Sequence, residues 1–192
     1  MSLIPSSVPM DDLPAERSRH FTTIVRYYRK FYEELEHSGA GLYRHTKLGA
    51  WAASRAPHVF YFFRTINLAV YNLFIDLGSG DGIVTCIAGL FTRSLGIEID
   101  ADLCSMAQNA ARTLSLNGRT DFVCGDYLAQ RFDKADCLYL YPDKPFNRIA
   151  EKLTNWQGAV LVYGPHFPPE ALRPVRTLGC GKERMILYSN YR

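Results

Sequence analysis

The sequence predicts an α/β fold, in which a mostly parallel sheet ends in an antiparallel edge hairpin and follows a helical extension. After residue 72, short apolar runs alternate with stretches whose apolar residues recur at helical spacing, as in strand-helix-strand units. A glycine-rich loop, "DLGSGDG", joins the first apolar run to the first of these helical stretches. Before this loop, the apolar residues recur mainly at helical spacing. We therefore expect a helical cap over residues 1–70 and a sheet domain over residues 71–192, which together form one compact unit.

The extension is predicted to contain three helical pieces. The first starts at Asp12, with Pro14 in its first turn, and ends at the "SGAG" stretch of residues 38–41. A second helix is expected after Thr46 and is broken at Pro57. The aromatic-rich residues that follow Pro57 favour a third helix.

The predicted parallel strands are five apolar runs, over residues 73–76, 94–99, 121–125, 136–141 and 159–164. Helices with one apolar stripe are expected after the first, second and fourth of these runs. Two further runs, over residues 174–178 and 184–189, flank a Cys180-Gly181 turn and predict the edge hairpin.

The composition is that of one globular domain, with 192 residues of which 47% are hydrophobic. The net charge of +3 is far below the basic load of a dedicated nucleic-acid-binding protein, although the N-terminal third is distinctly basic. We interpret these basic side chains as the solvated face of a helix. The alternative is a surface that binds an anionic partner. The five cysteines contain no Cys-x-x-Cys pair, so neither a disulfide framework nor a metal site is predicted. The pattern contains no signal peptide or membrane span, and we expect a cytoplasmic protein.

The glycine loop is predicted to hold a ligand, because ligands of open parallel sheets lie beyond the carboxyl ends of the strands. A dinucleotide-binding Gly-x-Gly-x-x-Gly loop would need glycine at position 83, where this chain has Ile83. The glycines stand instead at positions 78, 80 and 82, after Asp76. We expect the backbone of Gly78, Gly80 and Gly82, which carries no side chains, to let the ligand approach closely, and we expect Asp81 to cap the helix that follows. A plain tight turn is the alternative.

This loop resembles motif I of the class I methyltransferases, which use S-adenosylmethionine and have a Rossmann-like sheet, and the resemblance covers residues 74–188. It implies that Glu98, at the end of the second strand, takes both ribose hydroxyls, and that Asp126, after the third strand, contacts the adenine amino group. The structural alternatives are a helix N-cap for Glu98 or Asp100 and a surface-loop position for Asp126. In this part of the chain, the implied cofactor-binding residues are Asp76, Gly78, Ser79, Gly80, Glu98, Ile99, Asp126 and Tyr127.

Two segments, "ADCLYLYPDKPFNRIAEKL" and "GAVLVYGPHFPPEAL", resemble the small Dot1-like protein-lysine methyltransferases, including the group that acts on the ATP synthase c subunit. This branch also places a Tyr-x-x-Thr pattern near the methionine end of the cofactor, and Tyr43 and Thr46 match it. A core or interface position is the alternative for Tyr43. Methyltransferases of adenine or amide amino groups carry Asn- or Asp-Pro-Pro-Tyr where this chain has "YPDKP", so those acceptors are disfavoured.

The resemblance implies a methyltransferase whose acceptor is a protein lysine amine. Tyr141 and Pro142, at the end of the fourth strand, are the expected catalytic residues that line the transfer channel. The alternative is that Tyr139 and Tyr141 are ordinary alternating strand residues. An RNA or small-molecule methyltransferase and a catalytically silent cofactor-binding subunit remain open. The expected partner is a methyl-acceptor substrate, with protein favoured over nucleic acid, and the sequence leaves the oligomeric state open.

Overall fold

A seven-stranded sheet forms the centre of the computed structural model, which describes residues 15–39, 41–46, 49–145 and 147–190 without the side chains of Arg44 and Thr46. The strand order is β5-β4-β3-β6-β7-β9-β8; β9 pairs antiparallel with both neighbours, and the other pairs are parallel. The predicted sheet and its edge hairpin are therefore confirmed. The strands are β3 (Leu73–Leu77), β4 (Arg93–Glu98), β5 (Thr120–Cys124), β6 (Cys137–Leu140), β7 (Ala159–Tyr163), β8 (Arg173–Cys180) and β9 (Glu183–Ser189).

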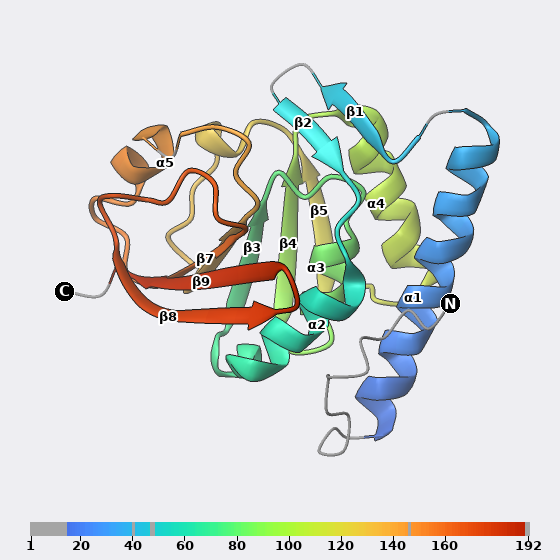
Figure 1. Cartoon of the computed structure of the whole chain (residues 1–192), viewed down its shortest axis with the longest axis horizontal. Helices are drawn as coiled ribbons and strands as arrows, with labels where there is room; N and C mark the ends of the chain where they lie inside the picture. Colours follow the sequence, from blue (N-terminus) through green and yellow to red (C-terminus); the bar gives the residue numbers. More distant parts are fainter. Residues whose placement is uncertain (1–14, 40, 47–48, 146, 191–192) are drawn as a thin grey trace.

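Helices cover both faces of this sheet. One face carries α1 (Ala15–His37), α2 (Ala56–Thr65), α3 (Ile83–Ala88) and α4 (Ala101–Thr113), and the other carries the short α5 (Asn147–Lys152) (Figure 1). Neighbouring strand residues divide between the two cores because their side chains alternate. Phe74 packs in the core beneath α1 to α3, whereas Ile75 packs with apolar residues of α5. Two short 3-10 turns are η1 (Leu68–Val70) and η2 (Tyr127–Ala129).

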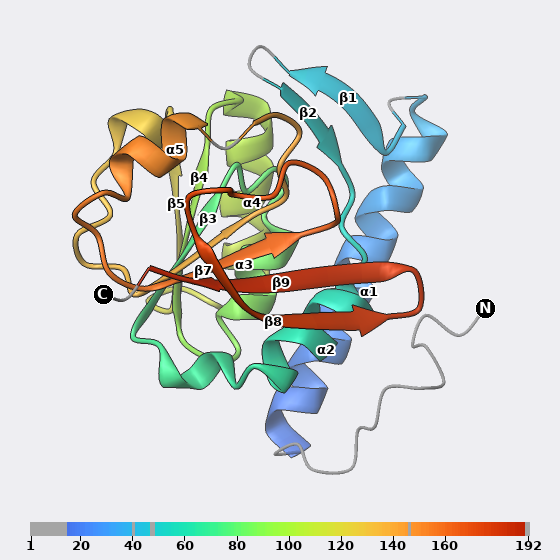
Figure 2. The ribbon, with the colours of Figure 1, turned by 60° about the vertical axis from the view of Figure 1, so that its left-hand side comes forward.

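The segment after α1 differs from its prediction. The helix expected after Thr46 is wrong, because β1 (Tyr43–Thr46) and β2 (Gly49–Ala52) form an antiparallel hairpin instead. Pro57 does not break a helix but stands in the first turn of α2. The N–H groups of a first turn have no partner within the helix, so the missing N–H of proline costs no hydrogen bond there. Figures 1 and 2 both show this hairpin at the upper ends of β3 and β4, apart from the sheet itself.

The N-terminal helices share a core with the sheet. The rings of Phe21 on α1 and Phe60 on α2 stack with their centroids 3.9 Å apart, and both belong to the core that includes Phe74. The described part of α1 starts at Ala15, so its predicted start at Asp12 lies outside the described residues. The helix predicted around residues 59–63 is confirmed as part of α2. Among the described helices, none has the length and apolar character needed to cross a membrane.

Candidate functional site

A cavity of about 680 Å³ opens at the carboxyl ends of β3, β4 and β6, where the strand order reverses. Its walls come from the glycine loop, from the ends of these strands, from the β1–β2 hairpin and from the loop after β6. The side chain of the predicted residue Thr46 lies outside the described part of the chain. The other predicted site residues all line this cavity: Tyr43, Asp76, Gly78, Ser79, Gly80, Glu98, Ile99, Asp126, Tyr127, Tyr141 and Pro142.

The three glycines of the loop all have positive φ angles but have different surroundings. A Cβ atom built on Gly78 (φ +83°) would meet nothing within 4 Å. A Cβ on Gly80 (φ +56°) would lie 2.5 Å from Cδ1 of Trp51, and one on Gly82 (φ +85°) would lie 2.6 Å from Cζ of Phe122. The expectation that the backbone of Gly80 is open to the ligand is therefore wrong, because the indole of Trp51 covers it. The open backbone surface of the loop is at Gly78.

Glu98 fixes the shape of the glycine loop. Its buried carboxylate accepts one hydrogen bond from the Gly80 N–H and one from the Asp100 N–H, each 2.8 Å long. An ionised carboxylate has about four acceptor positions, so lone pairs remain for the hydroxyl groups of a ligand. The alternative role as a helix N-cap belongs to Asp100, which accepts from the N–H groups of Asp102 and Leu103 at the start of α4.

Asp126 and Tyr127 lie at the end of the cavity formed by β5. One carboxylate oxygen of Asp126 accepts a 2.8 Å hydrogen bond from the Leu128 N–H and so caps η2. The second oxygen has no hydrogen bond within the described part of the chain, and the half-buried side chain lines the cavity. Burial raises the pKa of the neighbouring Tyr127 hydroxyl, which keeps it protonated and able to donate.

Asp76 lies beneath the glycine loop, at the floor of the cavity. Its side chain is 2% exposed and accepts a 2.7 Å hydrogen bond from the Thr85 hydroxyl. Burial raises the pKa of Asp76 to about 7, against the lowering effect of Thr85 and with a smaller contribution from Glu98 and Asp81.

Asp81 does not cap α3 as predicted. The N-cap of α3 is Gly82, without a side-chain cap bond, and one oxygen of Asp81 reaches only the Ile83 N–H at 3.3 Å. Its other oxygen accepts a 2.7 Å hydrogen bond from the Tyr32 hydroxyl of α1. Burial raises the pKa of Asp81 to about 6, opposed by the hydrogen bonds from Tyr32, Ile83 and Trp51. Asp81 departs from the predicted capping role because the Tyr32 hydroxyl, on the sequence-distant helix α1, makes the shorter hydrogen bond to its carboxylate.

The floor of the cavity is therefore acidic. Asp76, Asp81 and Glu98 are all buried, and none of them forms an ion pair with another described residue. A buried charge without a counter-ion is costly, and a carboxyl group in that position either takes up a proton or meets a cation. These three carboxyl groups therefore suit a ligand that carries positive charge.

Two buried hydroxyl groups of the cavity wall have no hydrogen-bond partner within the described residues. They are Oγ of Ser79 and the hydroxyl of Tyr139. A buried polar group without a partner costs on the order of 1–3 kcal/mol, so a ligand that supplies partners is stabilised by them. Ser79 was predicted to bind the cofactor, whereas Tyr139 was predicted only as an alternating strand residue.

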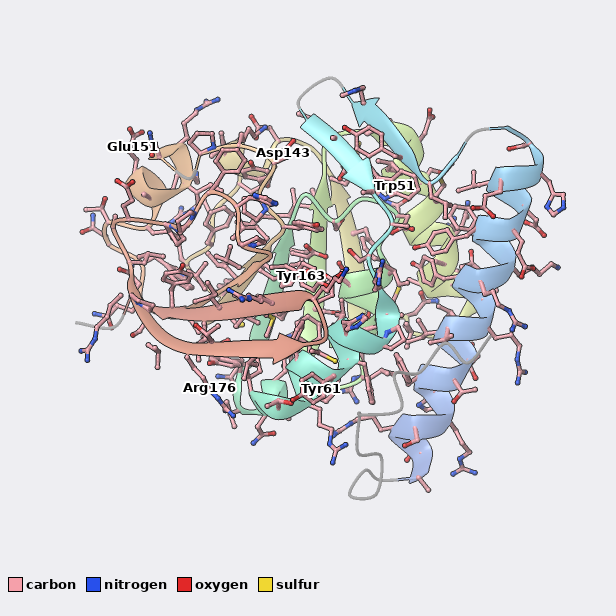
Figure 3. The ribbon with its side chains drawn as sticks, viewed as in Figure 1. Trp51, Tyr61, Asp143, Glu151, Tyr163 and Arg176 are labelled. Atoms are coloured by element: carbon pink, nitrogen blue, oxygen red, sulfur yellow. The ribbon has the colours of Figure 1, made fainter. Side chains whose placement is uncertain are left out.

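Tyr141 and Pro142 line the same cavity as the glycine loop and follow β6, the strand that pairs with β3. The Tyr141 side chain is 49% exposed, and its ring centroid lies 5.0 Å from that of Tyr163. Pro142 is buried, and Asp143 accepts a 2.9 Å hydrogen bond from the Ala50 N–H of the hairpin. Figure 3 shows Asp143 beside the start of β2 and Trp51 toward its other end.

The sequence reasoning missed Trp51 and Asp143, which both line the cavity. Trp51 lies in the segment predicted to be helical, and its partner Gly80 is remote in sequence, so local spacing gave no signal. Asp143 lies inside the "YPDKP" stretch, where only its neighbours Tyr141 and Pro142 were singled out. Within the described residues, no cluster of histidine, cysteine and acidic side chains is placed to hold a metal ion.

The comparison with protein families gives one match, to a family described as "Histone methylation protein DOT1". It covers residues 53–127, which is less than half of the chain but includes the glycine loop and the ends of β4 and β5. The search of curated proteins gives no match to the chain.

Solved structures resemble a larger part of the chain. An RNA methyltransferase from Salinibacter ruber in complex with S-adenosyl-L-homocysteine is 22% identical with a TM-score of 0.61, and the match covers 72% of this chain and 93% of that one. A conserved hypothetical protein from Streptococcus pyogenes is 14% identical (TM-score 0.55; 68% and 93% covered), and an S-adenosylmethionine-dependent methyltransferase from Aquifex aeolicus is 14% identical (TM-score 0.50; 62% and 81% covered). Together with the strand order, these likenesses show that the chain has the Rossmann-like fold of the class I methyltransferases.

Proposed function

We propose that the protein is a methyltransferase that uses S-adenosylmethionine. The observation that carries this proposal is the open backbone surface over Gly78, which lies between the buried carboxylates of Asp76 and Glu98 in one cavity. When bound, the cofactor supplies an electrophilic methyl group on a sulfonium sulfur. The acidic floor suits that positive charge and the cofactor's ammonium group.

The predicted cofactor-binding side chains that the structure describes all line the cavity, and we propose a role for most of them. Glu98 has lone pairs left for the ribose hydroxyls after it has bound the Gly80 and Asp100 amides. Ile99 and Tyr127 offer apolar surface to the adenine ring, and Asp126 has a free oxygen for its amino group. We assign Tyr43 and Asp76, which both line the cavity, to the methionine part, and we expect the unpartnered Ser79 hydroxyl to gain a partner from the bound cofactor.

For the acceptor we propose a protein lysine amine. The family match to a histone methylation protein and the sequence resemblance of the segment around Tyr141 support this choice. A lysine ammonium has an ordinary pKa of about 10.4 and must lose its proton before the nitrogen attacks the methyl group. The exposed ring of Tyr141, with Pro142 beside it, offers an apolar entrance that favours the neutral amine.

RNA is the second candidate acceptor. The likeness to the Salinibacter ruber RNA methyltransferase favours it, as do the exposed cationic side chains Arg19, Arg26, Arg29 and Lys30 on α1. The ion pairs of Arg29 with Glu33 and of Lys30 with Glu34 reduce the positive charge of that face, which weakens the case for phosphate binding.

Radiolabelled methyl transfer from S-adenosylmethionine into a host lysate tests both acceptors. We expect label that protease treatment removes and nuclease treatment leaves in place. Label removed by nuclease would support RNA instead. Calorimetric binding of S-adenosylhomocysteine without transfer to any lysate fraction would support a catalytically silent cofactor-binding subunit, and absence of binding by the folded protein would reject the proposal.

A further inference from the structure

Trp51 lies directly on the glycine loop, although it comes from the hairpin that precedes α2. Its side chain is 8% exposed and lines the cavity. The indole covers the backbone of Gly80 so closely that a Cβ atom there would lie 2.5 Å from Cδ1 and 2.8 Å from Nε1 of Trp51. Since Gly78 beside it is open, the indole stands at the border of the surface that is free for a ligand.

Asp81 ties the N-terminal helix α1 to the glycine loop and interacts with Trp51 of β2. Its carboxylate accepts a 2.7 Å hydrogen bond from the Tyr32 hydroxyl, and the Trp51 side chain acts on the same carboxyl group, whose pKa it lowers. Its backbone carbonyl accepts a 2.9 Å hydrogen bond from the Tyr28 hydroxyl. Both tyrosine donors come from α1, so Asp81 fixes this helix to the loop that is open at Gly78, with Trp51 of β2 beside it.

The hairpin is also tied to the loop after β6, through the residue that precedes Trp51. The Ala50 N–H donates to a carboxylate oxygen of Asp143, 2.9 Å away, in the loop after β6. A side chain at the neighbouring Gly49 would collide with the same oxygen. The hairpin therefore contacts both the loop after β6 and the glycine loop, through the neighbouring residues Ala50 and Trp51, and it lines the cavity with them (Figure 3).

We propose that Trp51 is a wall of the cofactor site that contacts the bound cofactor, and that Asp81 is the positioning residue that holds it there. This inference rests on the proposed function, because it takes the open surface at Gly78 as the cofactor's place. It adds a binding residue from the N-terminal segment to those of the strand ends. The β1–β2 hairpin is then part of the cofactor site and not only a covering element.

The chain contains two tryptophans, which makes the inference measurable by fluorescence. Trp156 is buried away from the cavity, where its indole N–H donates to the Ala135 carbonyl, so Trp156→Phe leaves Trp51 as the single emitter. S-adenosylhomocysteine is added to this variant, and calorimetry measures the occupancy independently. We expect the Trp51 emission to change in step with the occupancy.

Asp81→Asn then tests the positioning role. In the Trp156→Phe background, we expect Asp81→Asn to shift the emission of the free protein and to raise the Kd for S-adenosylhomocysteine about tenfold, as loss of a hydrogen bond to a charged group predicts. Asp121→Asn is the matched control, because Asp121 is exposed at the amino end of β5 and should change neither quantity. Should Asp81→Asn fail to fold, Trp51→Phe in the wild-type chain removes the indole that packs on Gly80 and should raise the Kd several-fold by calorimetry.

Three results would overturn the inference. Calorimetric saturation without any change in Trp51 emission would show that Trp51 does not meet the ligand. Wild-type Kd values for Trp51→Phe, and for Asp81→Asn where it folds, would remove the positioning role. Absence of binding by the wild-type protein would reject the proposed function itself and this inference with it, and that outcome is distinct from the first two.

Discussion

The loop after β3 and the loop after β6 line one cavity, yet the protein holds them differently. In the glycine loop, Gly80 and Asp81 are buried, and the loop is tied by Glu98 from β4 and by Tyr32 from α1. In the loop after β6, Tyr141 and residues 143–145 are exposed. One side of the cavity is thus fixed by buried hydrogen bonds, and the other is open to a second molecule. This difference matches a cofactor bound on the fixed side and an acceptor that approaches the open side.

The largest effect is expected from Glu98→Ala, on the fixed side. The variant removes the acceptor for two backbone amides of the site in addition to the ribose contact, and each hydrogen bond to a charged group contributes about 1.5–3 kcal/mol. We expect the Kd for S-adenosylhomocysteine, measured by calorimetry, to rise about 100-fold, which corresponds to ~2.8 kcal/mol. Asp121→Asn should bind as the wild type does. An unchanged affinity of Glu98→Ala would mean that the end of β4 does not hold the ribose.

Gly80→Ala and Gly78→Ala separate the two roles within the glycine loop. Both positions have positive φ, so an alanine is strained at each by roughly 1–2 kcal/mol, but only at position 80 does it also collide with Trp51. We expect Gly80→Ala to lower the free energy of unfolding by about 1–3 kcal/mol more than Gly78→Ala does, as overpacking predicts. Urea denaturation measures both. Equal losses would contradict the close packing of Trp51 on Gly80.

Asp76 is expected to make stability depend on pH. Its pKa is raised by burial to about 7 from 3.8, so between these values the folded chain keeps a proton that the unfolded chain has released. Stability is therefore greatest below this range and falls as the pH rises through it. Asp81, with a pKa of about 6, contributes in the same direction up to that pH. Urea denaturation at several pH values measures this. Asp76→Asn should remove the decrease in the free energy of unfolding between pH 6 and 7, and if that decrease persists in the variant, it comes from another group.

The same carboxyl group should affect cofactor affinity in the opposite sense. A cationic ligand is bound better by the ionised form of Asp76, so the affinity for S-adenosylmethionine should rise as the pH increases through 7. Asp76→Asn should bind with an affinity that no longer rises there. Calorimetry at several pH values measures this, and an unchanged pH dependence in the variant would place the ligand's charge away from Asp76.

The smallest effect is expected on the open side, from Tyr141→Phe. The variant keeps the ring, which contacts Tyr163 and faces the cavity, and removes only the hydroxyl. We expect an unchanged Kd for S-adenosylhomocysteine and a turnover number that falls about fivefold, equivalent to ~1 kcal/mol. The reverse pattern, with weaker binding and normal turnover, would move Tyr141 from the acceptor side to the cofactor side.

The sheet was predictable because each parallel strand is a short apolar run that ends in glycine or in polar residues. Parallel topology then brings the strand ends together, which is why Gly78, Glu98 and Asp126 share a cavity as the motif pattern suggested. The hairpin of residues 43–52 was not predictable in the same way. Its position depends on contacts with Gly80 and Asp143, which are remote in sequence and leave no local periodicity.

The role of Asp81 was likewise unpredictable from local sequence. An aspartate before a helix is typically read as an N-cap, but Tyr32, 49 residues earlier in the chain, binds its carboxylate instead. Asp76 was placed correctly at the end of the first strand, whereas its raised pKa depends on burial that only the packed structure supplies. The cytoplasmic location and the division of the chain at residue 70 stay predictions.

A crystal structure of the protein with S-adenosylhomocysteine would show directly whether the glycine loop holds the cofactor. We expect the ligand to lie over the backbone of Gly78, with its ribose hydroxyls on the Glu98 carboxylate and its adenine beside Ile99. Ligand density at any other place in the molecule, with this cavity filled only by solvent, would contradict this expectation.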